Sequence, residues 1–288
     1  MRMNNSLGCS VASVFNSNGL APLQSISTVV LDLDGVVYRG LTPIPGAQET
    51  ILWLRQQGIR VLYLTNNSTL SRVDYVHRLG HFGIPCRKED VYSSSYATAL
   101  YIKSQKKSRP RVLIVGEGGL FAELRRAGAE VLRKPDGGPI DYVVVGMDRR
   151  LTYTKIAAAQ HAIINGAQFV ASNRDPVYPV EHGLIPGGGT VVAAIEVASQ
   201  QKPVLIGKPS PYIMRLLLRN ERVSPQQVLL IGDRLDTDIA GAVLCGWDSL
   251  LVLTGVSTRD DVTTSRVRPT FVADDLGALI ADEEPPRL

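Results

Sequence analysis

Carboxylate, ammonium, hydroxyl and amide side chains stand directly after four short apolar runs of this sequence. The four sets are Asp32 with Asp34, Thr65 with Asn66, Lys208, and Asp233. Apolar runs of this length are typical of strands that are buried in a sheet. Ligands of open α/β sheets bind outside the carboxyl ends of the strands, so we expect the four sets to form one site.

Asp32 and Asp34 are the first candidates for chemistry. Residues two apart on an extended chain point to the same side, and Gly35 would let the chain turn sharply close to a ligand. Two neighbouring carboxylates repel each other unless a cation lies between them or one of them holds a proton. Asp233 would add a third acid, and a set of hard oxygen ligands favours Mg²⁺.

Lys208, Thr65 and Asn66 supply groups that bind anions. The ammonium of Lys208 would offset negative charge, either of the acids or of an anionic substrate. The hydroxyl of Thr65 and the side chain or backbone of Asn66 can donate hydrogen bonds to an oxyanion. Each element alone is commonplace, but a carboxylate nucleophile, a metal ion, a lysine and hydroxyl donors together indicate a site for a phosphoryl group.

The elements that would position these residues alternate between strands and helices. The apolar runs predict strands over 28–33, 59–64, 204–206, 228–231 and 249–253. The helical patterns cover 46–57, 71–79, 94–104, 190–199, 211–220 and 236–244. Such alternation predicts a parallel sheet with helices on both faces. Asp238 falls in the last of these helices, whereas Asp236 is expected to be a solvated residue at its start.

A second alternating series interrupts the first. It has strands over 112–115, 142–145 and 169–171 and helices over 120–127 and 153–165, and a loop rich in Pro and Gly over 173–189 leads back. The pattern predicts one α/β domain inserted into another. We place the core domain at 26–103 and 186–288, the inserted domain at 104–185, and a flexible tail at 1–25.

Composition and charge exclude several classes of protein. The 288 residues are 44% hydrophobic and 20% charged, which is neither a disordered nor a fibrous composition. The net charge of +4 falls in residues 104–185, which hold 12 basic and 8 acidic residues, and the sequence lacks the basic runs typical of nucleic-acid binding. Because no apolar run reaches about 18 residues, we expect no membrane span.

Three widely spaced cysteines argue against a disulfide framework and favour a reducing compartment. We therefore expect a cytoplasmic protein. Organellar targeting by residues 1–25 is the alternative, although this stretch lacks a clear apolar core and carries one arginine.

Four motifs carry a resemblance to a known family. DLDGVVYRG (32–40), LTNNS (64–68), GKPSP (207–211) and GDRLDTDI (232–239) resemble the motifs of the haloacid dehalogenase superfamily. Segments 143–155 and 172–189 are similar to the cap of its phosphatases with a C2-type cap, the group of nitrophenyl-, phosphoglycolate and pyridoxal phosphate phosphatases and NagD. The resemblance covers residues 28–275. It implies a Rossmann-like, doubly wound parallel sheet with an inserted α/β cap.

The resemblance also implies catalytic roles. Asp32 would attack phosphorus and form an aspartyl-phosphate. Asp34 would protonate the leaving alcohol and then activate the water that releases phosphate. Thr65 and Asn66 would hold the phosphoryl oxygens, together with the backbone N–H of Gly35. Lys208 would orient Asp32 and screen its charge.

For the metal and the cap, the resemblance implies further residues. Mg²⁺ would be bound by Asp32, the backbone carbonyl of Asp34 and Asp233, with Asp238 behind them fixing Lys208 or a metal-bound water. Asp148, Arg174 and Asp175 are cap residues that could meet the substrate. Arg174 departs from the family, which often reads Thr-Asn-Pro-Asp where this chain has Ser-Asn-Arg-Asp, and a solvated arginine is the alternative.

The partner implied is a small phosphorylated metabolite, with neither nucleic acid nor membrane, and the caps of this group suggest a homodimer. Phosphoglycolate or a generic nitrophenylphosphatase activity leads, and pyridoxal phosphate, sugar phosphate or nucleoside monophosphate hydrolysis is the alternative. A non-catalytic phosphate-binding regulatory protein would be expected to lose one of the key acids or the lysine. A dehalogenase would need neither the second acid, Asp34, nor a metal.

Overall fold

The computed structural model describes residues 26–105, 107–181 and 183–280. The predicted tail at 1–25 lies outside the described residues. The described chain forms two compact units, one of residues 26–62 with 222–280 and the other of residues 63–221. These units differ in extent from the predicted domains, whose limits at 103/104 and 185/186 stay a prediction.

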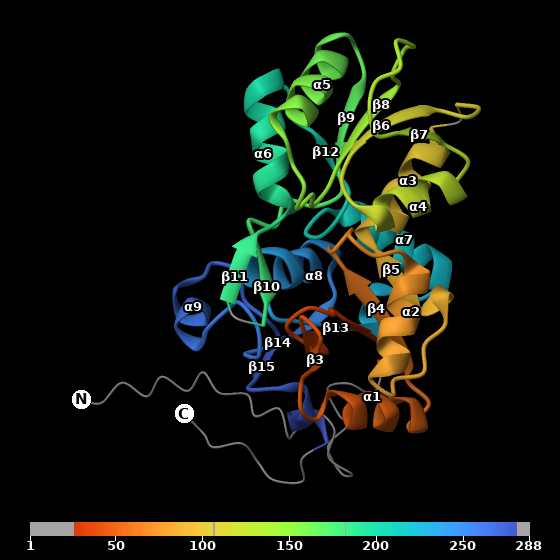
Figure 1. Ribbon diagram of the computed structural model, residues 1–288. Coiled ribbons are helices and arrows are strands. Elements are labelled where there is room, and N and C mark those ends of the chain that lie inside the picture. Colours follow the sequence, from red (N-terminus) through yellow and green to blue (C-terminus); the bar gives the residue numbers. More distant parts are fainter. Residues whose placement is uncertain (1–25, 106, 182, 281–288) are drawn as a thin grey trace. The chain divides into compact units, whose positions relative to one another are not determined.

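Parallel strands form the centre of the first unit. In spatial order they are β15 (Phe271–Ala273), β14 (Asp248–Val252), β13 (Val228–Gly232) and β1 (Thr28–Leu31). All residues of β1 and β13 are buried, which explains why these strands read as continuous apolar runs rather than alternating ones. The predicted buried parallel strands are confirmed (Figure 1).

Helices and turns complete the first unit. They are α1 (Ala47–Gln56), the 3₁₀ turn η3 (Pro225–Gln227), the π turn η4 (Leu235–Ile239), α8 (Ala240–Cys245), α9 (Arg259–Thr264) and the 3₁₀ turn η5 (Leu276–Leu279). A small hairpin, β2 (Tyr38–Arg39) with β3 (Thr42–Pro43), follows β1. The predicted helix 236–244 is thus two pieces, because the chain first makes a wide π turn.

Strand β4 (Arg60–Thr65) carries the chain into the second unit. At its start the Arg60 N–H donates to the Ser27 carbonyl at 2.9 Å, and its last three residues pair in parallel with β5 (Val91–Ser93). The helices near it are α2 (Arg72–His81), α3 (Ser94–Ser104) and α7 (Pro211–Glu221), with the 3₁₀ turn η2 at Lys88–Asp90. Ser71 and Asp74 form a capping box at the start of α2.

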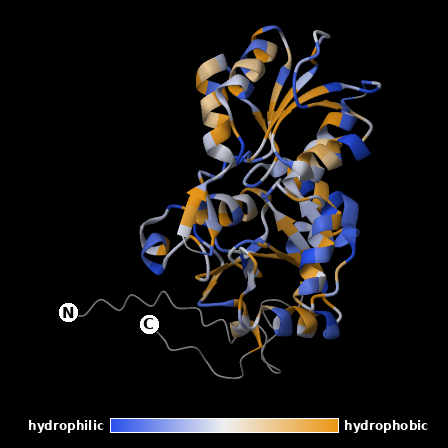
Figure 2. Ribbon diagram, in the orientation of Figure 1, coloured by the Kyte–Doolittle hydropathy of each residue, from blue (hydrophilic) through white to orange (hydrophobic). Residues whose placement is uncertain are grey.

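A five-stranded parallel sheet dominates the second unit. Its spatial order is β12 (Val204–Leu205), β9 (Gln168–Ala171), β8 (Tyr142–Val145), β6 (Arg111–Val115) and β7 (Glu130–Leu132). Figure 1 shows α5 (Tyr153–Ile164) and α6 (Gly188–Ser199) on one side of this sheet and α4 (Gly118–Arg126) on the other. The central strands are coloured as hydrophobic in Figure 2.

Helix α6 and strand β12 lie with this sheet, whereas the sequence pattern assigned them to the first series. Val191, Val192 and Ile195 of α6 pack in one core with Leu113 and Val143. Val204 and Leu205 of β12 pair with β9. The prediction of their sheet was wrong because the sequence of an apolar helix, or of a short strand, is the same whichever sheet it joins. Only packing decides that.

The segment predicted as a returning loop contains an antiparallel hairpin, β10 (Val177–Val180) with β11 (Gly183–Pro186). Two of its residues are prolines, which disfavour the interior of a sheet but are tolerated in such an edge pair. Among the described residues, no helix has the length and apolar character needed to cross a membrane.

Candidate functional site

Three buried aspartates converge in the first unit. The side chains of Asp32, Asp233 and Asp238 each place one carboxylate oxygen so that all three oxygens lie within 4.8 Å of one another. Asp32 follows β1, Asp233 follows β13, and Asp238 comes from the π turn η4. We refer to these three residues as the acid cluster. The structure therefore brings together two predicted metal ligands and the acid that was predicted to stand behind them.

The turn after β1 explains where Asp32 and Asp34 stand. The strand ends at Leu31, two residues earlier than predicted, because the Leu33 carbonyl accepts from the N–H groups of Val36, Val37 and Tyr38. Whether both aspartates share a side, as expected from an extended chain, stays a prediction. Asp34 is buried as well.

Gly35 gives room to the acid cluster. Its φ is +92°, and a Cβ built on it would lie 2.5 Å from Asp233 Oδ2. Its N–H donates to the Tyr38 carbonyl at 2.8 Å. This donor is therefore already used, which contradicts the expectation that it meets a phosphoryl oxygen. The glycine is needed for space and backbone conformation instead.

Asp233 is held by the loop after β14. The Val256 N–H donates to Asp233 Oδ2 at 2.8 Å, and the Ser257 N–H donates to the Asp233 carbonyl at 3.0 Å. A Cβ on Gly255 would lie 1.8 Å from the same Oδ2. Glycine at this position is thus required for the carboxylate to approach the backbone.

The π turn separates two acids that the sequence places two residues apart. Asp238 is fully buried and accepts from the Arg234 N–H at 3.2 Å. Asp236 keeps 59% of its side chain exposed and pairs with the Arg234 guanidinium at 2.7 Å. The expectation that Asp236 is solvated is confirmed.

The donor set of the acid cluster fits a hard divalent cation. Three buried carboxylates that crowd one point repel one another unless positive charge lies between them. Carboxylate oxygens are the ligands that Mg²⁺ prefers in proteins. Gly35 and Gly255 lie so close to the Asp233 carboxylate that a side chain at either position would collide with it.

In the second unit, the side chain of Asn66 forms two hydrogen bonds with the backbone of Lys208. Lys208 N–H donates to Asn66 Oδ1 at 2.8 Å, and Asn66 Nδ2 donates to the Lys208 carbonyl at 2.9 Å. We call these two bonds the amide clamp. The expectation that the Asn66 side chain binds phosphoryl oxygens is contradicted, because its amide is occupied by Lys208 and by Asp175. The predicted contact through the Asn66 backbone stays a prediction.

The side chains of Lys208 and Thr65 are buried at the end of β4. Lys208 Nζ donates to the Leu64 carbonyl at 2.7 Å, which anchors the ammonium beside this strand. Thr65 Oγ1 accepts from the Asn67 N–H at 3.1 Å and can still donate its own proton. Both residues carry groups of the kind that bind an anion, a hydroxyl and an ammonium.

Two of the predicted cap residues have structural contacts. Asp148 accepts from the Arg150 N–H at 2.9 Å and from Lys155 Nζ at 2.6 Å, which closes the turn before α5. Arg174 pairs with Glu196 of α6 at 2.6 Å. Asp148 is thus a residue of a polar turn, and Arg174 is an ion-paired residue on the surface of the unit.

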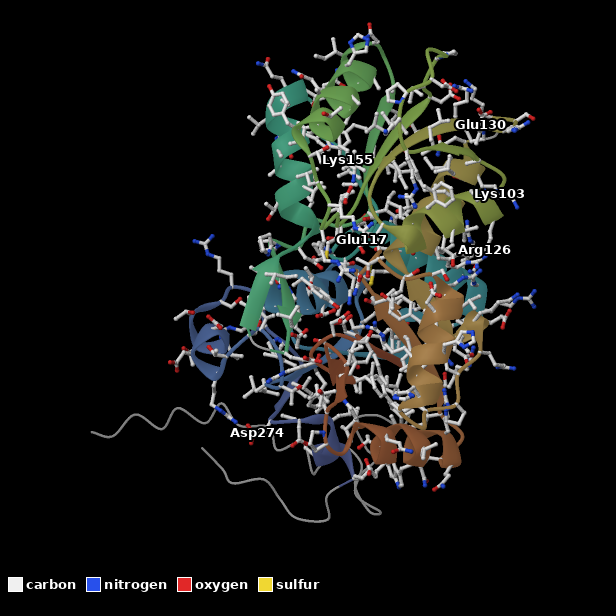
Figure 3. All side chains as sticks on the ribbon, viewed as in Figure 1. Lys103, Glu117, Arg126, Glu130, Lys155 and Asp274 are labelled. Atoms are coloured by element: carbon white, nitrogen blue, oxygen red, sulfur yellow. The ribbon has the colours of Figure 1, made fainter. Side chains whose placement is uncertain are left out.

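Glu117, which Figure 3 labels, forms a further ion pair with Arg149 in the second unit. Burial disfavours the charged form of Glu117, but hydrogen bonds from the Arg149 side chain and backbone outweigh it, so the pKa of Glu117 is lowered. The pair ties the start of α4 to the turn after β8.

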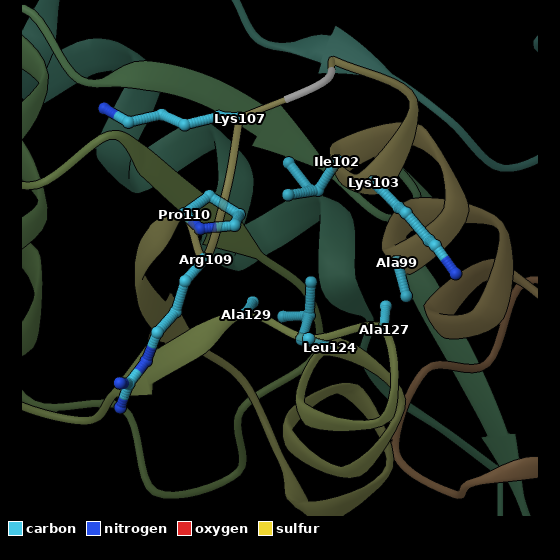
Figure 4. Close-up of a pocket in the computed structure, with 10 residues that line it drawn as sticks. Ala99, Ile102, Lys103, Lys107, Arg109, Pro110, Leu124, Ala127 and Ala129 are labelled. Carbon is cyan, nitrogen blue, oxygen red and sulfur yellow. The ribbon is translucent and has the colours of Figure 1, made fainter.

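One pocket of about 220 Å³ lies apart from all these residues. It is lined by the end of α3, the end of α4 and the segment that leads into β6 (Figure 4). Two of its three cationic residues have partners, since Lys107 pairs with Asp141 and Arg109 with Glu130. We assign no role to this pocket.

Sequence reasoning missed three residues that support the site. Asn173 Nδ2 and Ser94 Oγ both donate to the Asn66 carbonyl, at 2.8 and 2.6 Å. Gly255 leaves space for the Asp233 carboxylate. The only signal was position, since Asn173 and Gly255 come shortly after predicted strands and Ser94 opens a predicted helix, and position does not distinguish a supporting residue from an ordinary turn residue.

Comparisons with known proteins give a consistent pattern. A model of a haloacid dehalogenase-like hydrolase matches residues 29–130, and a second model of such hydrolases matches residues 205–279. An acid sugar phosphatase of Staphylococcus aureus is 37% identical over 262 residues, which cover 91% of this chain and all of the relative.

Solved structures are similar along most of the chain. A p-nitrophenyl phosphatase from Archaeoglobus fulgidus has a TM-score of 0.82 and 33% identity, covering 88% of this chain and 98% of its own. A glycerol phosphate phosphatase from Mycobacterium tuberculosis, in complex with magnesium, has a TM-score of 0.82 and 36% identity, covering 89% and 78%. A 4-nitrophenylphosphatase from Thermotoga maritima has a TM-score of 0.83 and 31% identity, covering 91% and 99%.

Proposed function

Because the chain belongs to the haloacid dehalogenase-like hydrolases and is a phosphatase of that family, we propose that it hydrolyses small phosphomonoesters through an aspartyl-phosphate on Asp32. The observation that carries this proposal is the acid cluster, in which a buried aspartate at the end of β1 meets two others. A cation held by the three carboxylates would let the negatively charged Asp32 approach an anionic substrate.

The first chemical step joins Asp32 to the substrate. A carboxylate oxygen of Asp32 attacks phosphorus, the bond between phosphorus and the ester oxygen breaks, and Asp34 gives its proton to the departing alcohol. In the second step a water attacks phosphorus and gives a proton to Asp34, while the bond to Asp32 breaks and inorganic phosphate forms. Asp34 is thus acid in one step and base in the next.

The remaining residues bind and orient the phosphoryl group. The Thr65 hydroxyl and the Asn66 backbone hold its oxygens, and the Lys208 ammonium offsets its charge. Mg²⁺ would be bound by the side chains of Asp32 and Asp233 and by the backbone carbonyl of Asp34. The Asp238 side chain would bind it either directly or through a water. When bound, the cation would neutralise charge on the transferring group and on the crowded carboxylates.

We favour phosphoglycolate and aromatic phosphates such as nitrophenyl phosphate as substrates. The names of the relatives also support glycerol phosphate and sugar phosphates, and pyridoxal phosphate and nucleoside monophosphates follow. The net charge of +4 in residues 104–185 would attract such anions. We further propose a cytoplasmic enzyme, a homodimer through the cap, and neither nucleic acid nor membrane as a partner.

A substrate panel tests the proposed activity. Phosphate release would be followed with these phosphomonoesters at matched concentration, and the compounds would be ranked by kcat/KM. We expect hydrolysis of several small monoesters and a marked preference among them. Failure to release phosphate from any member would contradict the proposal.

Trapping tests the covalent intermediate. In Asp34→Asn the second step lacks its base, so the aspartyl-phosphate should accumulate when the enzyme is given nitrophenyl phosphate, whose leaving group needs little protonation. We expect an added mass of one phosphoryl group on the peptide that holds Asp32, sensitive to hydroxylamine. A direct attack of water on the substrate would leave that peptide unmodified.

A further inference from the structure

We propose that Asn66 and Asp175 are positioning residues that fix Lys208 for the phosphoryl-transfer reaction, an inference that rests on the proposed function of Lys208. Neither side chain would touch the substrate. Instead, Asp175 holds the Asn66 amide, and that amide holds the backbone of Lys208.

The amide clamp uses every polar group of the Asn66 side chain. Oδ1 accepts from the Lys208 N–H at 2.8 Å, and the two Nδ2 protons go to the Lys208 carbonyl and to Asp175 Oδ1, both at 2.9 Å. Asn66 is buried, so these bonds replace water and are costly to break. An asparagine side chain that binds both backbone groups of one residue fixes the position and rotation of that residue.

Asp175 sets the orientation of the amide. A carboxylate can only accept, so the Asn66 Nδ2 must face it and Oδ1 must face the Lys208 N–H. With the amide turned over, an oxygen would oppose both the carboxylate and the Lys208 carbonyl. The loop after β9 further supports the clamp, because Asn173 Nδ2 donates to the Asn66 carbonyl at 2.8 Å.

Gly207 shows how closely this loop approaches the clamp. A Cβ at Gly207 would lie 2.5 Å from Asn66 Oδ1 and 2.5 Å from the Ser172 carbonyl. The Gly207 N–H donates to that same carbonyl at 2.9 Å. The segment that carries Lys208 is therefore held between the end of β4 and the end of β9.

Lys208 is thus fixed at both ends of its side chain. Its backbone lies in the amide clamp, and its ammonium donates to the Leu64 carbonyl at 2.7 Å. A misplacement of about 1 Å in a site residue can cost roughly 100-fold in rate, even when the change lies away from the chemistry. Loss of the clamp should consequently slow the chemical step more than it weakens substrate binding.

Kinetics of single variants give the first test. We expect Asn66→Ala to lower kcat by about 10- to 100-fold with KM changed by less than about threefold, and Asp175→Ala to lower kcat less, because one of the three Asn66 bonds is lost. Asn165→Ala, at the exposed end of α5, is the matched control and should leave kcat unchanged. An unchanged kcat in Asn66→Ala would contradict the inference.

A swap of the two side chains keeps the test informative if the alanine variant unfolds. Asn66→Asp sets two carboxylates against each other and removes both donors, so kcat should fall. The double variant with Asp175→Asn restores a donor and an acceptor in reversed order, and it should recover part of the lost kcat. A double variant no better than Asn66→Asp would count against the pairing.

A cycle with Lys208→Met separates this inference from the proposed function. If Asn66 acts through Lys208, Asn66→Ala should lower kcat/KM by at most about twofold in the Lys208→Met background, because effects along one chain of contacts do not add. Equal effects in both backgrounds would show that Asn66 acts elsewhere. Full activity of Lys208→Met alone would instead overturn the proposed role of the lysine.

Discussion

The acid cluster and the amide clamp satisfy their polar groups in opposite ways. In the first unit, Asp32, Asp233 and Asp238 crowd their carboxylates together, and glycines at 35 and 255 remove every obstacle to that crowding. In the second unit, Asn66 and Lys208 match each donor to an acceptor. The first arrangement calls for a cation, whereas in the second the Asn66 amide finds all its partners among the residues of the unit.

The difference predicts how each region responds to change. A region of like charges is unstable by itself and depends on what binds there. A region of matched hydrogen bonds is already organised and is damaged by the loss of any one partner. Removal of a bound cation should therefore affect mainly the acid cluster. Removal of a side chain should impair both regions.

The largest effect is expected from Asp32→Asn. The amide is a poor nucleophile, so turnover should fall by about 10³-fold or more while the fold persists. Phosphate release and the near-UV circular dichroism spectrum of the variant would be measured together. Turnover close to that of the unmodified protein would refute Asp32 as the nucleophile.

Metal removal is expected to have the next largest effect. EDTA should abolish activity and Mg²⁺ should restore it. Independently of activity, Mg²⁺ should raise Tm by a few degrees, because a ligand that binds only the folded state stabilises it. Differential scanning fluorimetry would measure this shift, which Asp233→Asn should lose. A Tm unaffected by Mg²⁺ would break the proposed contrast between the two regions.

A smaller effect should follow from Gly255→Ala. Its Cβ would lie 1.8 Å from Asp233 Oδ2, so that carboxylate must move and Mg²⁺ affinity should fall by about 10-fold or more. Titration of activity with Mg²⁺ would measure the change. Gly80→Ala is the matched control, because nothing lies within 4 Å of its added Cβ, and it should gain up to about 1 kcal/mol in stability.

The smallest effect concerns the paired charges of the second unit. Since its folded pKa is lowered, ionised Glu117 adds stability above its ordinary pKa of 4.5, and this is lost as pH falls through the folded value. The pair is partly exposed, so Glu117→Gln should cost about 0.5–1 kcal/mol at pH 7 and less below pH 4.5. Urea unfolding at both pH values would measure this, with the exposed Glu89→Gln as control.

Much of the core could be predicted because buried strands have a strong pattern. β8 and α3 have the bounds expected from their sequence patterns, and β1 and β13 differ by at most two residues. Short strands were missed. β5, β7 and β15 have three residues each, which is too short to show a period.

The site was predicted in part for a similar reason. The types and order of Asp32, Asp233 and Lys208 indicate chemistry whatever the detailed geometry. The amide clamp could not be predicted, because whether Asn66 faces a ligand or a backbone depends on the path of a loop 142 residues away. The role of Gly35 was misassigned because a hydrogen bond to Tyr38 cannot be read from the motif.

The π turn η4 has a consequence for helical phase. A π turn contains one residue more than an α-helical turn, and each α-helical residue rotates about 100° around the axis. In the turn Leu235–Ile239, residues two apart lie on roughly opposite sides of the axis, which fits a buried Asp238 and an exposed Asp236. Deleting Thr237 would return the turn to α-helical phase and rotate the Asp238 carboxylate away from its two partners, with every charged residue still in the chain.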